Sequence, residues 1–394
     1  MPPPRAVFSL LLILSLSAAK TIDMGIFNPE CLVGKPVVYN QSESVAVPWF
    51  TINLDLPPEQ RWVEIASIYK EKMSAALKTV LSLLNIIGDG ILVDILEDAM
   101  KTAAELLPSP YKEEIHAMAQ LTGLPLEHLT LLNLFYEVQK GCTSLVAEDA
   151  QGHITHARNL DFGTFFVWDG AAAEWQLSQN LRALVVNLEF KQDGATLFKG
   201  ITFAGHLGLI TGLKPNAFTI TTNTRFGNTF KNLYWFLHEG LQGRKFILYA
   251  NRDVLTTAKS YEEALNMIVE TKLLANGYFI LGGVNPGEGA VITHGFNQTD
   301  HIERIDTSKP NGWYVLETNY DWDKEVLFLD DRRAPGNDCM RKLGQANANH
   351  VGIYQVLSSK PNLNKATVHT TVMSARTGML ETYIRHCPHP CWFV

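Results

Sequence analysis

The 394-residue sequence is poor in positive charge, in cysteine and in long hydrophobic runs. Its 33 lysines and arginines are outnumbered by 40 acidic residues, so the formal charge is −7 and no basic stripe is available for nucleic acid. After the N-terminal run, the most hydrophobic stretch is Ala75–Leu96, which Lys78 and Gly88-Asp89-Gly90 interrupt, so we expect no transmembrane helix. Internal repeats, phosphate-binding loops and metal-ligand clusters are also lacking, so we expect neither a cofactor nor a metal.

The N-terminus has the features of a secretory signal. Arg5 precedes an apolar run from Ala6 to Leu16, and Ser17-Ala18-Ala19 then supplies the small residues that signal peptidase prefers. We therefore expect residues 1–19 to be removed on the secretory route, with the lysosome or the cell exterior as the destination. Two glycosylation sequons, which begin at Asn40 and Asn297, agree with this route.

The five cysteines are an odd number, so at least one thiol stays unpaired in an oxidising compartment. Cys387 and Cys391 flank the short, stiff Pro388-His389-Pro390 loop, which a local disulfide can close. Zinc binding through His386 or the histidine of this loop is the rival interpretation, and secretion favours the disulfide.

The other three cysteines lie far apart in the sequence. Cys31 and Cys339 are far apart in sequence and can tie the N-terminal region to the remainder, which leaves Cys142 over. The chain also changes character at Cys142. Apolar spacing typical of helices precedes this residue, and short β-rich segments follow it.

The predicted elements indicate an α+β protein. The helices expected before Cys142 span residues 62–84, 91–107, 111–122 and 126–139. The strands expected after it span residues 184–190, 196–203, 217–223, 278–282, 290–293, 313–319, 367–373 and 379–385. Further helices are expected at residues 230–241, 261–271 and 351–358. Mostly antiparallel strands mixed with helices predict stacked sheets flanked by helices.

A β-hairpin is predicted to start at Cys142, because two β-rich segments flank a turn at Asp149–Gly152. If the residues directly beside this turn face each other, Cys142 lies opposite Asn159, with Arg158 one step along. Asp161 then follows just past the end of the second strand. The hairpin therefore brings the Arg158 guanidinium close to the thiol.

This arrangement suits a nucleophilic thiol. A thiol with an ordinary pKa of about 8.5 is almost wholly protonated in an acidic compartment, and an adjacent permanent cation lowers that pKa. If Cys142 is also a chain terminus, its α-amine becomes a general base near the sulfur, and Asp161 can orient the amine. The alternative is an inert buried thiol, with Arg158 and Asp161 as a surface ion pair.

The residues around Cys142 resemble those of the acid ceramidase family. The similarity lies in Gly141-Cys142-Thr143-Ser144-Leu145-Val146-Ala147-Glu148-Asp149 and in His156-Ala157-Arg158-Asn159-Leu160-Asp161-Phe162. Further similar blocks follow the family's order across the mature chain: Val47–Pro58, Glu317-Thr318-Asn319-Tyr320-Asp321, Leu329-Asp330-Asp331-Arg332-Arg333 and Leu357-Ser358-Ser359-Lys360-Pro361. This family belongs to the N-terminal-nucleophile hydrolases, in the branch that also holds the bile-salt hydrolases.

The resemblance implies an αββα fold and self-cleavage between Gly141 and Cys142. We therefore expect a mainly helical α subunit at residues 20–141 and a β subunit with the catalytic domain at residues 142–394. The two subunits are expected to stay together.

The resemblance also implies the covalent links and the substrate. A Cys31–Cys339 disulfide is expected to join the subunits, and Cys387–Cys391 to close a local loop. The implied substrate is ceramide, a membrane lipid that is cleaved to sphingosine and a free fatty acid in the lysosome. The need for a sphingolipid activator protein stays open.

By analogy with the family, Cys142 attacks the amide carbonyl, Arg158 sets the ionisation of the thiol, and Asp161 holds the α-amine. The side-chain amide of Asn319 is the implied oxyanion donor, and Arg332 matches the family's second arginine. Losing one oxyanion donor typically raises the barrier by about 3–4 kcal/mol. From the residues alone, Asn319 can equally end a strand, and Arg332 can pair with a neighbouring aspartate.

Three positions depart from the family pattern. Thr224 stands where relatives carry Glu in an Asn-Glu-Arg run, Ala157 replaces a usual Gly, and Gly141 replaces a bulkier apolar residue. Thr224 has no carboxyl group, but its backbone N–H can still serve as an oxyanion donor. Gly141 tolerates the strained geometry that an N-to-S acyl shift requires, so self-cleavage is expected to survive.

These departures keep other functions open. The runner-up is an N-acylethanolamine acid amidase, which acts on a different head group; the retained cysteine pairs favour a ceramidase. A non-catalytic lipid-binding pseudoenzyme is the second alternative, because of Thr224. A papain-like protease would need a catalytic histidine in a characteristic context, which none of the 12 histidines has. The candidates for an apolar membrane-facing surface are Val80, Leu81, Leu83, Leu84, Ile86, Ile87, most of Ile91–Ile95, and Tyr234, Trp235 and Phe236, although such residues more often lie in a core.

Overall fold

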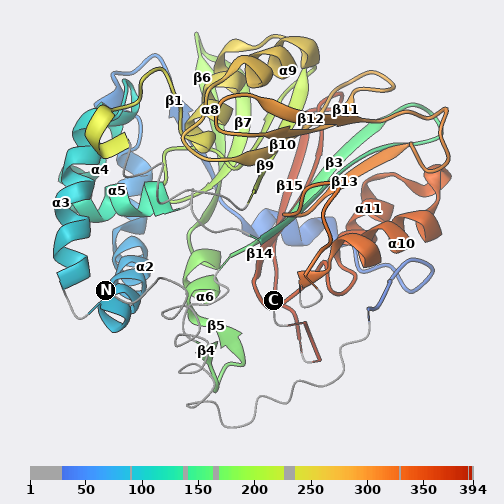
Figure 1. Ribbon diagram of the computed structural model, residues 1–394, viewed down its shortest axis with the longest axis horizontal. Helices are drawn as coiled ribbons and strands as arrows, with labels where there is room; N and C mark the ends of the chain where they lie inside the picture. Colours follow the sequence, from blue (N-terminus) through green and yellow to red (C-terminus); the bar gives the residue numbers. More distant parts are fainter. Residues whose placement is uncertain are drawn as a thin grey trace.

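The computed structural model describes residues 29–88, 91–135, 141–162, 168–225, 236–327, 330–388 and 390–392. The expected signal peptide lies outside these residues, as does the first half of the helix expected at residues 230–241. The described chain folds into two stacked β-sheets with helices on their outer faces and a further group of helices at one side (Figure 1).

The side group consists of four helices that precede Cys142 and agree with the predicted ranges. They are α2 (Val63–Gly88), α3 (Ile91–Leu106), α4 (Tyr111–Thr122) and α5 (Leu126–Phe135). Apolar residues of α2 recur at helical spacing and are buried together, namely Ile65, Ala66, Tyr69, Met73, Ala76, Leu77 and Val80. Helix α4 ends at Gly123, whose left-handed backbone (φ 66°) lets its N–H bond back to the carbonyl of Ala119.

The N-terminal region is mainly helical, as predicted, and contains one strand that the sequence analysis did not identify. Strand β1 (Trp49–Asn53) runs parallel to β6 (Val185–Gln192), with Phe50 opposite Leu188, and so extends the larger sheet. The signal for this strand is short: buried Phe50 and Ile52 alternate with exposed neighbours. The 3₁₀ helices η1 (Gln41–Ala46) and η2 (Pro58–Gln60) flank it.

The larger sheet has the order β1-β6-β7-β8-β9-β10-β11-β12 in the described chain. From β6 onward, neighbouring strands are antiparallel. The strands are β7 (Ala195–Phe203), β8 (Thr211–Lys214), β9 (Phe218–Thr224), β10 (Gly277–Gly282), β11 (Gly289–His294) and β12 (Thr299–Arg304). Helices α8 (Ile247–Thr257) and α9 (Tyr261–Glu270) lie between β9 and β10 in sequence and pack on this sheet.

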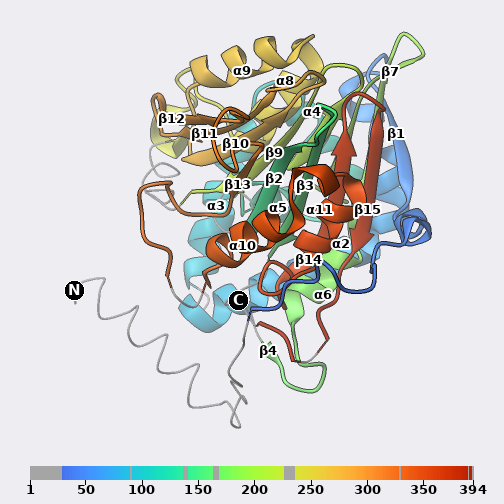
Figure 2. The same cartoon turned by 90° about the vertical axis from the view of Figure 1, so that its right-hand side faces the viewer.

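The smaller sheet has the antiparallel order β13-β2-β3-β14-β15. Its strands are β2 (Gly141–Glu148), β3 (Ile154–Asp161), β13 (Tyr314–Glu317), β14 (Thr367–Ser374) and β15 (Met379–Ile384). Helices α10 (Arg333–Leu343) and α11 (His350–Leu357), joined through η4 (Gln345–Asn347), cover its outer face (Figure 2). The short elements β4 (Trp168–Asp169), β5 (Glu174–Trp175) and α6 (Gln176–Arg182) connect β3 to β6.

The four layers confirm the predicted αββα fold class. Helices α8 and α9 form the first layer, the two sheets form the middle layers, and α10 and α11 form the fourth. Apolar side chains from both sheets meet between them and include Val146, Tyr278, Ile280, Val291 and Val315. The sheets are thus held face to face by a continuous core, which fixes the position of any side chain that points between them.

The helical group is joined to the sandwich by buried polar contacts. The two terminal nitrogens of Arg252 in α8 donate to the carboxylate oxygens of Glu114 in α4 at 2.5 and 2.6 Å. Next to this pair, the ring of Tyr111 stacks on that of Tyr249 with the centroids 3.9 Å apart. The two parallel hydrogen bonds fix the orientation of α4 relative to α8. The pair is hard to separate, because a buried charge that loses its partner is energetically costly.

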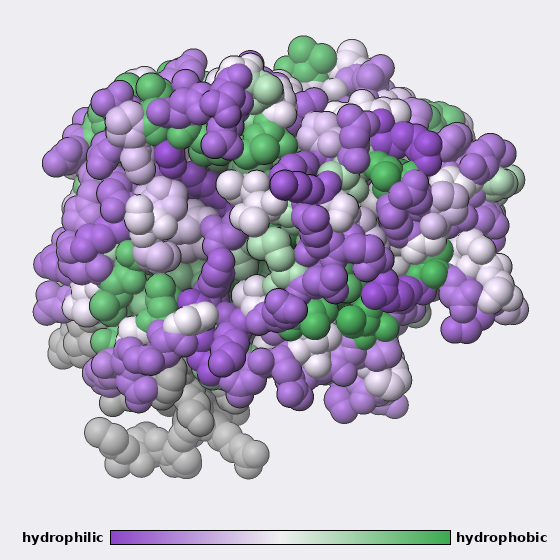
Figure 3. All heavy atoms as spheres, turned by 90° about the horizontal axis from the view of Figure 1, so that it is seen from above, coloured by the Kyte–Doolittle hydropathy of each residue, from purple (hydrophilic) through white to green (hydrophobic). Residues whose placement is uncertain are grey.

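The residues expected to form a membrane-facing apolar surface do not do so where they are described. Val80 is 2% exposed and Phe236 is 0% exposed, and both belong to the main core. The side chains of residues 83–95, and Tyr234 and Trp235, lie outside the described part. Among the helices that the structure describes, none combines the length and hydropathy needed to cross a membrane. On the face seen in Figure 3, hydrophobic residues form small separate patches among hydrophilic ones.

Candidate active site

Cys142 is the second residue of β2 and is completely buried. The hairpin with β3 forms as predicted, but the predicted register was wrong by one residue. Cys142 lies opposite Leu160, not Asn159, because Glu148 pairs with Ile154 and leaves His153 in the turn. Asp149 closes that turn by accepting the N–H groups of Gln151 and His153 on its carboxylate, which adds one residue to the loop.

The corrected register explains how Arg158 reaches the thiol. Arg158 pairs with Ser144, two residues from Cys142, so both side chains point to the same face of the sheet. The Nη2 group of Arg158 contacts Cys142 Sγ directly. Nη1 lies against the carbonyl oxygen of Ile210 and the hydroxyl of Thr211. Burial lowers the pKa of Arg158 and outweighs the neighbouring Cys142 and Asp161, which act to raise it.

The histidine next to Arg158 on this face of β3, His156, is not available as a base in an acidic compartment. His156 lies two residues from Arg158 on β3, and its ring nitrogens bond to the hydroxyls of Thr219 and Thr221 at 2.8 and 3.0 Å. Burial, reinforced by the charge of Arg158, lowers the pKa of His156 to about 3. A neutral ring held by two hydroxyl groups is a structural residue, which agrees with the absence of a papain-like context.

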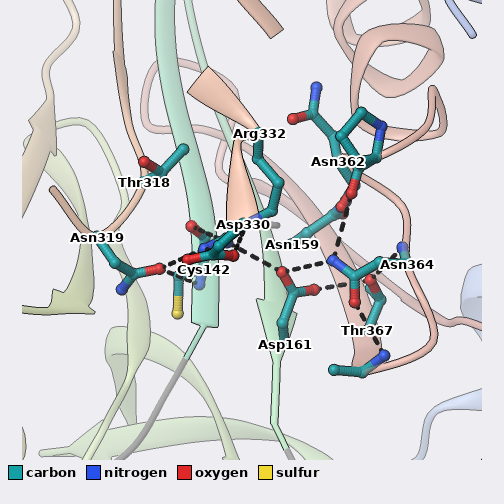
Figure 4. A network of polar contacts seen from close by, with 12 residues as sticks. Cys142, Asn159, Asp161, Thr318, Asn319, Asp330, Arg332, Asn362, Asn364 and Thr367 are labelled. Atoms are coloured by element: carbon teal, nitrogen blue, oxygen red, sulfur yellow. Dashed lines mark hydrogen bonds and ion pairs between the residues drawn. The ribbon is translucent and has the colours of Figure 1, made fainter. Parts of the chain in front are cut away.

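Asp161 points to the opposite face of the same hairpin, toward α10 and α11. Its carboxylate accepts hydrogen bonds from Thr367 Oγ1 at 2.7 Å and from Asn364 Nδ2 at 3.0 Å. Arg332 Nη1 adds an ion pair at 3.1 Å. In Figure 4 the sulfur of Cys142 points away from these contacts. The thiol and the carboxylate therefore lie on different sides of the sheet, with the backbone of Cys142 between them.

Arg332 connects Asp161 to the backbone of Cys142. It immediately precedes α10 and is 1% exposed. Its Nη1 donates to the Cys142 carbonyl oxygen at 2.6 Å, and its Nη2 donates to Asn319 Oδ1 at 2.8 Å (Figure 4). The neighbouring Asp330 also accepts from its Nε at 3.0 Å. The sequence allowed two roles for Arg332, an ion pair with a neighbouring aspartate or a place in the active site. The structure shows both, because Arg332 binds Asp330 and also contacts Asp161, Cys142 and Asn319.

Asn319 lies two residues beyond the end of β13, and its side chain bridges the two sheets. Oδ1 accepts the backbone N–H of Cys142 at 2.9 Å, and Nδ2 donates to the Thr224 carbonyl oxygen at 2.8 Å. Because Arg332 also donates to Oδ1, the orientation of the amide is fixed, with its N–H donors directed toward Thr224. Thr224 is the last residue of β9 and is buried, so its backbone lies beside the amide expected to bind an oxyanion.

The cysteine pairs are those expected. Cys31 and Cys339 form a disulfide with Cα atoms 5.5 Å apart, and Cys387 and Cys391 form one at 5.9 Å. Cys142 takes part in neither disulfide. A zinc site at residues 386–389 is therefore wrong, because both candidate thiolates are bonded to each other. Elsewhere in the described part of the chain, no three metal-ligating side chains come together.

The structure adds residues that the sequence interpretation missed. Asn364 and Thr367 hold Asp161, and Asn364 is itself fixed because its Oδ1 accepts the N–H of Ala366 at 2.8 Å. Asn223 precedes Thr224 and donates to the carbonyl oxygens of Glu317 and Thr318 at 3.0 and 2.8 Å. A signal existed for Asn223, since it lies in the run around Thr224. None marked Asn364 or Thr367.

Comparison with known proteins assigns the site to a family. Residues 142–334 match the model for linear amide C–N hydrolases of the choloylglycine hydrolase family, so that the match begins at Cys142. Residues 45–106 match the model for the beta subunit of N-acylethanolamine-hydrolyzing acid amidase. A solved structure of a Caenorhabditis elegans ortholog of that amidase is 27% identical with a TM-score of 0.52, covering 62% of this chain and 100% of its own.

Full-length relatives are more similar still. A probable acid ceramidase of Caenorhabditis elegans is 41% identical over 401 residues and covers 100% of both chains. The acid ceramidase of Homo sapiens is 41% identical over 350 residues, or 88% of each chain. That of Bos taurus shows the same identity over 349 residues. The chain therefore belongs to the acid ceramidase family, a family of linear amide C–N hydrolases with the N-terminal-nucleophile hydrolase fold.

Proposed function

We propose that this protein hydrolyses ceramide to sphingosine and a free fatty acid, with Cys142 as the nucleophile. One observation carries the proposal: the cysteine that takes part in neither disulfide begins the region that matches the hydrolase family, and a buried guanidinium contacts its sulfur. A thiol beside a permanent cation is favoured as the thiolate, which is the reactive form. Relatives at 41% identity that are named acid ceramidases support ceramide as the substrate.

The first reaction is self-cleavage between Gly141 and Cys142. The thiolate of Cys142 attacks the Gly141 carbonyl carbon, the C–N bond breaks, and the nitrogen takes a proton to become the α-amine of Cys142. Water then hydrolyses the resulting thioester, leaving Gly141 with a carboxylate and restoring the thiol. The site suits glycine here, because a Cβ on residue 141 would lie 3.1 Å from Asp161 Cβ and would crowd the carboxylate.

The second reaction uses the new α-amine as the base. It takes the thiol proton as Cys142 attacks the amide carbonyl of the substrate, and it returns that proton to the sphingosine amine as the C–N bond breaks. We assign Arg158 to the thiolate, Asp161 to the orientation of the amine and Arg332 to the orientation of Asn319. The Asn319 amide and the Thr224 backbone N–H receive the developing oxyanion. Water then releases the fatty acid from the thioester.

Self-cleavage would give subunits of residues 20–141 and 142–394. The Cys31–Cys339 disulfide then joins them, because it links the N-terminal segment to α10. The Glu114–Arg252 pair joins α4 to α8 without a covalent bond. The exposed side chains of Asn40 and Asn297 are suitable glycosylation sites for a protein delivered to the lysosome, and the same route leads to secretion.

Incubation of purified precursor at mildly acidic pH tests this proposal. We expect two fragments under reducing conditions, the larger beginning at Cys142 by N-terminal sequencing, together with release of fatty acid from ceramide. Cys142→Ala is expected to abolish both, whereas Cys142→Ser is expected to retain slow cleavage, since a hydroxyl is a weaker nucleophile in this role. An unbroken wild-type chain that still hydrolyses ceramide would refute the mechanism.

N-acylethanolamine hydrolysis is the second candidate. It is favoured by the match of residues 45–106 to the amidase subunit and by the fold of the Caenorhabditis elegans amidase ortholog. Parallel assays with ceramide and palmitoylethanolamide decide between the two substrates. A higher kcat/KM for palmitoylethanolamide would replace the first proposal while leaving the roles of the cleavage site and nucleophile intact.

The third candidate is a non-catalytic lipid-binding protein, and the effect of Thr224 on activity decides between this candidate and an active enzyme. The Thr224 side chain cannot supply the carboxyl group that the resemblance leads us to expect, but its backbone lies beside the amide of Asn319. If that loss is a handicap, Thr224→Glu is expected to raise kcat/KM for ceramide severalfold, with Thr222→Glu, on the same strand, as a negative control. Binding of ceramide without turnover by either the wild type or Thr224→Glu would favour the non-catalytic alternative.

A further inference from the structure

The end of β9 is hydrogen-bonded to the segment that comprises the last residue of β13 and the residues that follow it. The side chain of Asn223 donates to two carbonyl oxygens of that segment, those of Glu317 and Thr318. The next residue, Thr224, accepts a hydrogen bond from Asn319. Because β9 belongs to the larger sheet and β13 to the smaller one, these bonds fix the two sheets relative to each other at the candidate active site.

The third residue of this series, Arg225, forms a clamp with Asp321. Its Nε and Nη2 bond to the two carboxylate oxygens of Asp321 at 2.7 and 2.8 Å. The hydroxyl of Tyr278 in β10 donates to the same carboxylate at 2.7 Å, and Asp300 in β12 accepts from Arg225 Nη1. A two-pronged arginine–carboxylate pair fixes direction as well as distance, which a single ion pair does not.

The clamp lies directly beside the two groups assigned to the oxyanion. Arg225 immediately follows Thr224, and Asp321 lies two residues after Asn319. Those two donors come from different sheets, so their separation depends on how the sheet edges are held. We propose that Arg225 and Asp321 are positioning residues, which set the spacing of the Asn319 amide and the Thr224 N–H; this inference rests on the proposed function.

The clamp keeps its charges under acidic conditions. Burial opposes ionisation of Asp321, but the bonds from Arg225 and Tyr278 outweigh it and lower the pKa of that carboxyl. Burial likewise opposes the charge of Arg225, and Asp321 and Asp300 outweigh it and raise the pKa of the guanidinium. Asp300 and Tyr278 contact the pair directly, Lys324 adds a positive charge near Asp321, and Arg333 donates to the Asp321 carbonyl oxygen.

The test uses Asp321→Asn, Arg225→Gln and the double variant in the mature enzyme. Hydrolysis of p-nitrophenyl laurate is the readout, because this ester needs the nucleophile and the oxyanion donors but carries no sphingoid head group. We expect each single variant to lose roughly 10- to 100-fold in kcat with little change in KM, since a small displacement of a donor mainly affects the transition state. The double variant is expected to be no slower than the slower single variant.

Alkylation of Cys142 by iodoacetamide separates positioning from general damage. Its rate is expected to stay unchanged in all three variants, because Arg158 sets the thiolate from another strand. Arg225→Lys, which keeps the charge but offers one contact, is expected to recover part of the lost kcat. Equal losses in alkylation and kcat, or additive losses in the double variant, would overturn the inference.

Asp253→Asn is the matched control. Asp253 also accepts from a tyrosine hydroxyl, that of Tyr111 at 2.7 Å, and pairs with a cation, Lys245, but it lies on α8. We expect its kcat to match that of the wild type, and a comparable loss in this control would also overturn the inference. Wild-type protein that cleaves the ester but not ceramide would refute the proposed substrate alone, leaving the clamp fully testable.

Discussion

The two faces of the β2–β3 hairpin are assembled in different ways. On the face between the sheets, Cys142 and Arg158 come from the hairpin itself and are 16 residues apart in sequence. On the face toward α10 and α11, Asp161 meets Arg332, Asn364 and Thr367, which are 171, 203 and 206 residues away. One face is thus a product of local pairing, and the other forms only when the whole sandwich is folded.

This difference indicates that the two faces of the candidate site have different roles. The local face prepares the nucleophile, because a cation two residues along the neighbouring strand reaches the sulfur wherever the hairpin forms. The long-range face holds the backbone of Cys142, through Arg332 on its carbonyl oxygen and Asn319 on its N–H. Changes on the first face are therefore expected to alter the reactivity of the thiol, and changes on the second to alter its placement.

The largest effect is expected from Arg158→Gln. Without the cation, the apparent pKa of the Cys142 thiol is expected to rise by about two units, so that alkylation near pH 5 slows roughly 100-fold. kcat/KM is expected to fall by a similar factor. The measurement is the pH profile of iodoacetamide alkylation. The matched control is Arg385→Gln, another buried arginine, which bonds to Ser358. An alkylation profile that does not move would show that the contact with Arg158 has no electrostatic role.

A smaller effect is expected on the other face, from Asp161→Asn. The alkylation profile is expected to stay near that of the wild type, while self-cleavage slows about tenfold, because Asp161 holds Arg332, which binds the Cys142 carbonyl oxygen, and does not contact the thiol. The time course of fragment formation on a reducing gel measures this. Asp149→Asn, at the opposite end of the hairpin, is expected to cleave at the normal rate. If Asp161→Asn changes alkylation as strongly as Arg158→Gln, the two faces do not have separate roles.

The same division explains what the sequence could reveal. The helices before Cys142 and most strands after it follow from apolar periodicity, and the contact between Cys142 and Arg158 follows from one turn. The register was wrong by one residue because the turn includes His153, a detail of the Asp149 hydrogen bonds that composition does not encode. Strand β1 was missed because its parallel partner, β6, lies more than a hundred residues away.

Long-range polar partners were beyond local inference. Thr367 begins a predicted strand, but the sequence did not indicate that strand's partner, and Thr367 and Asn364 meet Asp161 only because β14 pairs with β3. Arg332 was identified through resemblance alone, since its sequence neighbour Asp330 offered a sufficient local partner. The folded structure was needed to show that Arg332 binds both Asp330 and the distant Asp161.

The smallest expected effect concerns stability on the Cys142 face. Glu317 pairs with Ser144 across the sheet, so its side chain points between the sheets, where it is 4% exposed. Burial, with a further contribution from Glu303, outweighs the opposing effect of Arg333 and raises the pKa of Glu317 from 4.5 to about 8. The carboxyl group is therefore protonated in the folded protein under acidic conditions.

The sign of the resulting pH dependence follows from proton binding. Between pH 4.5 and about 8, folded Glu317 binds a proton that the unfolded chain has lost, so its contribution to stability falls as the pH rises. Glu317→Gln removes this contribution. Its melting temperature is expected to equal that of the wild type near pH 4.5 and to exceed it increasingly toward pH 7.5, by scanning calorimetry. His156, whose pKa is lowered and whose effect has the opposite sign, is present in both proteins and cancels in the difference. A constant difference between the two melting temperatures across this range would mean that Glu317 is ionised in the folded state, and that the face carrying the thiol tolerates a buried anion.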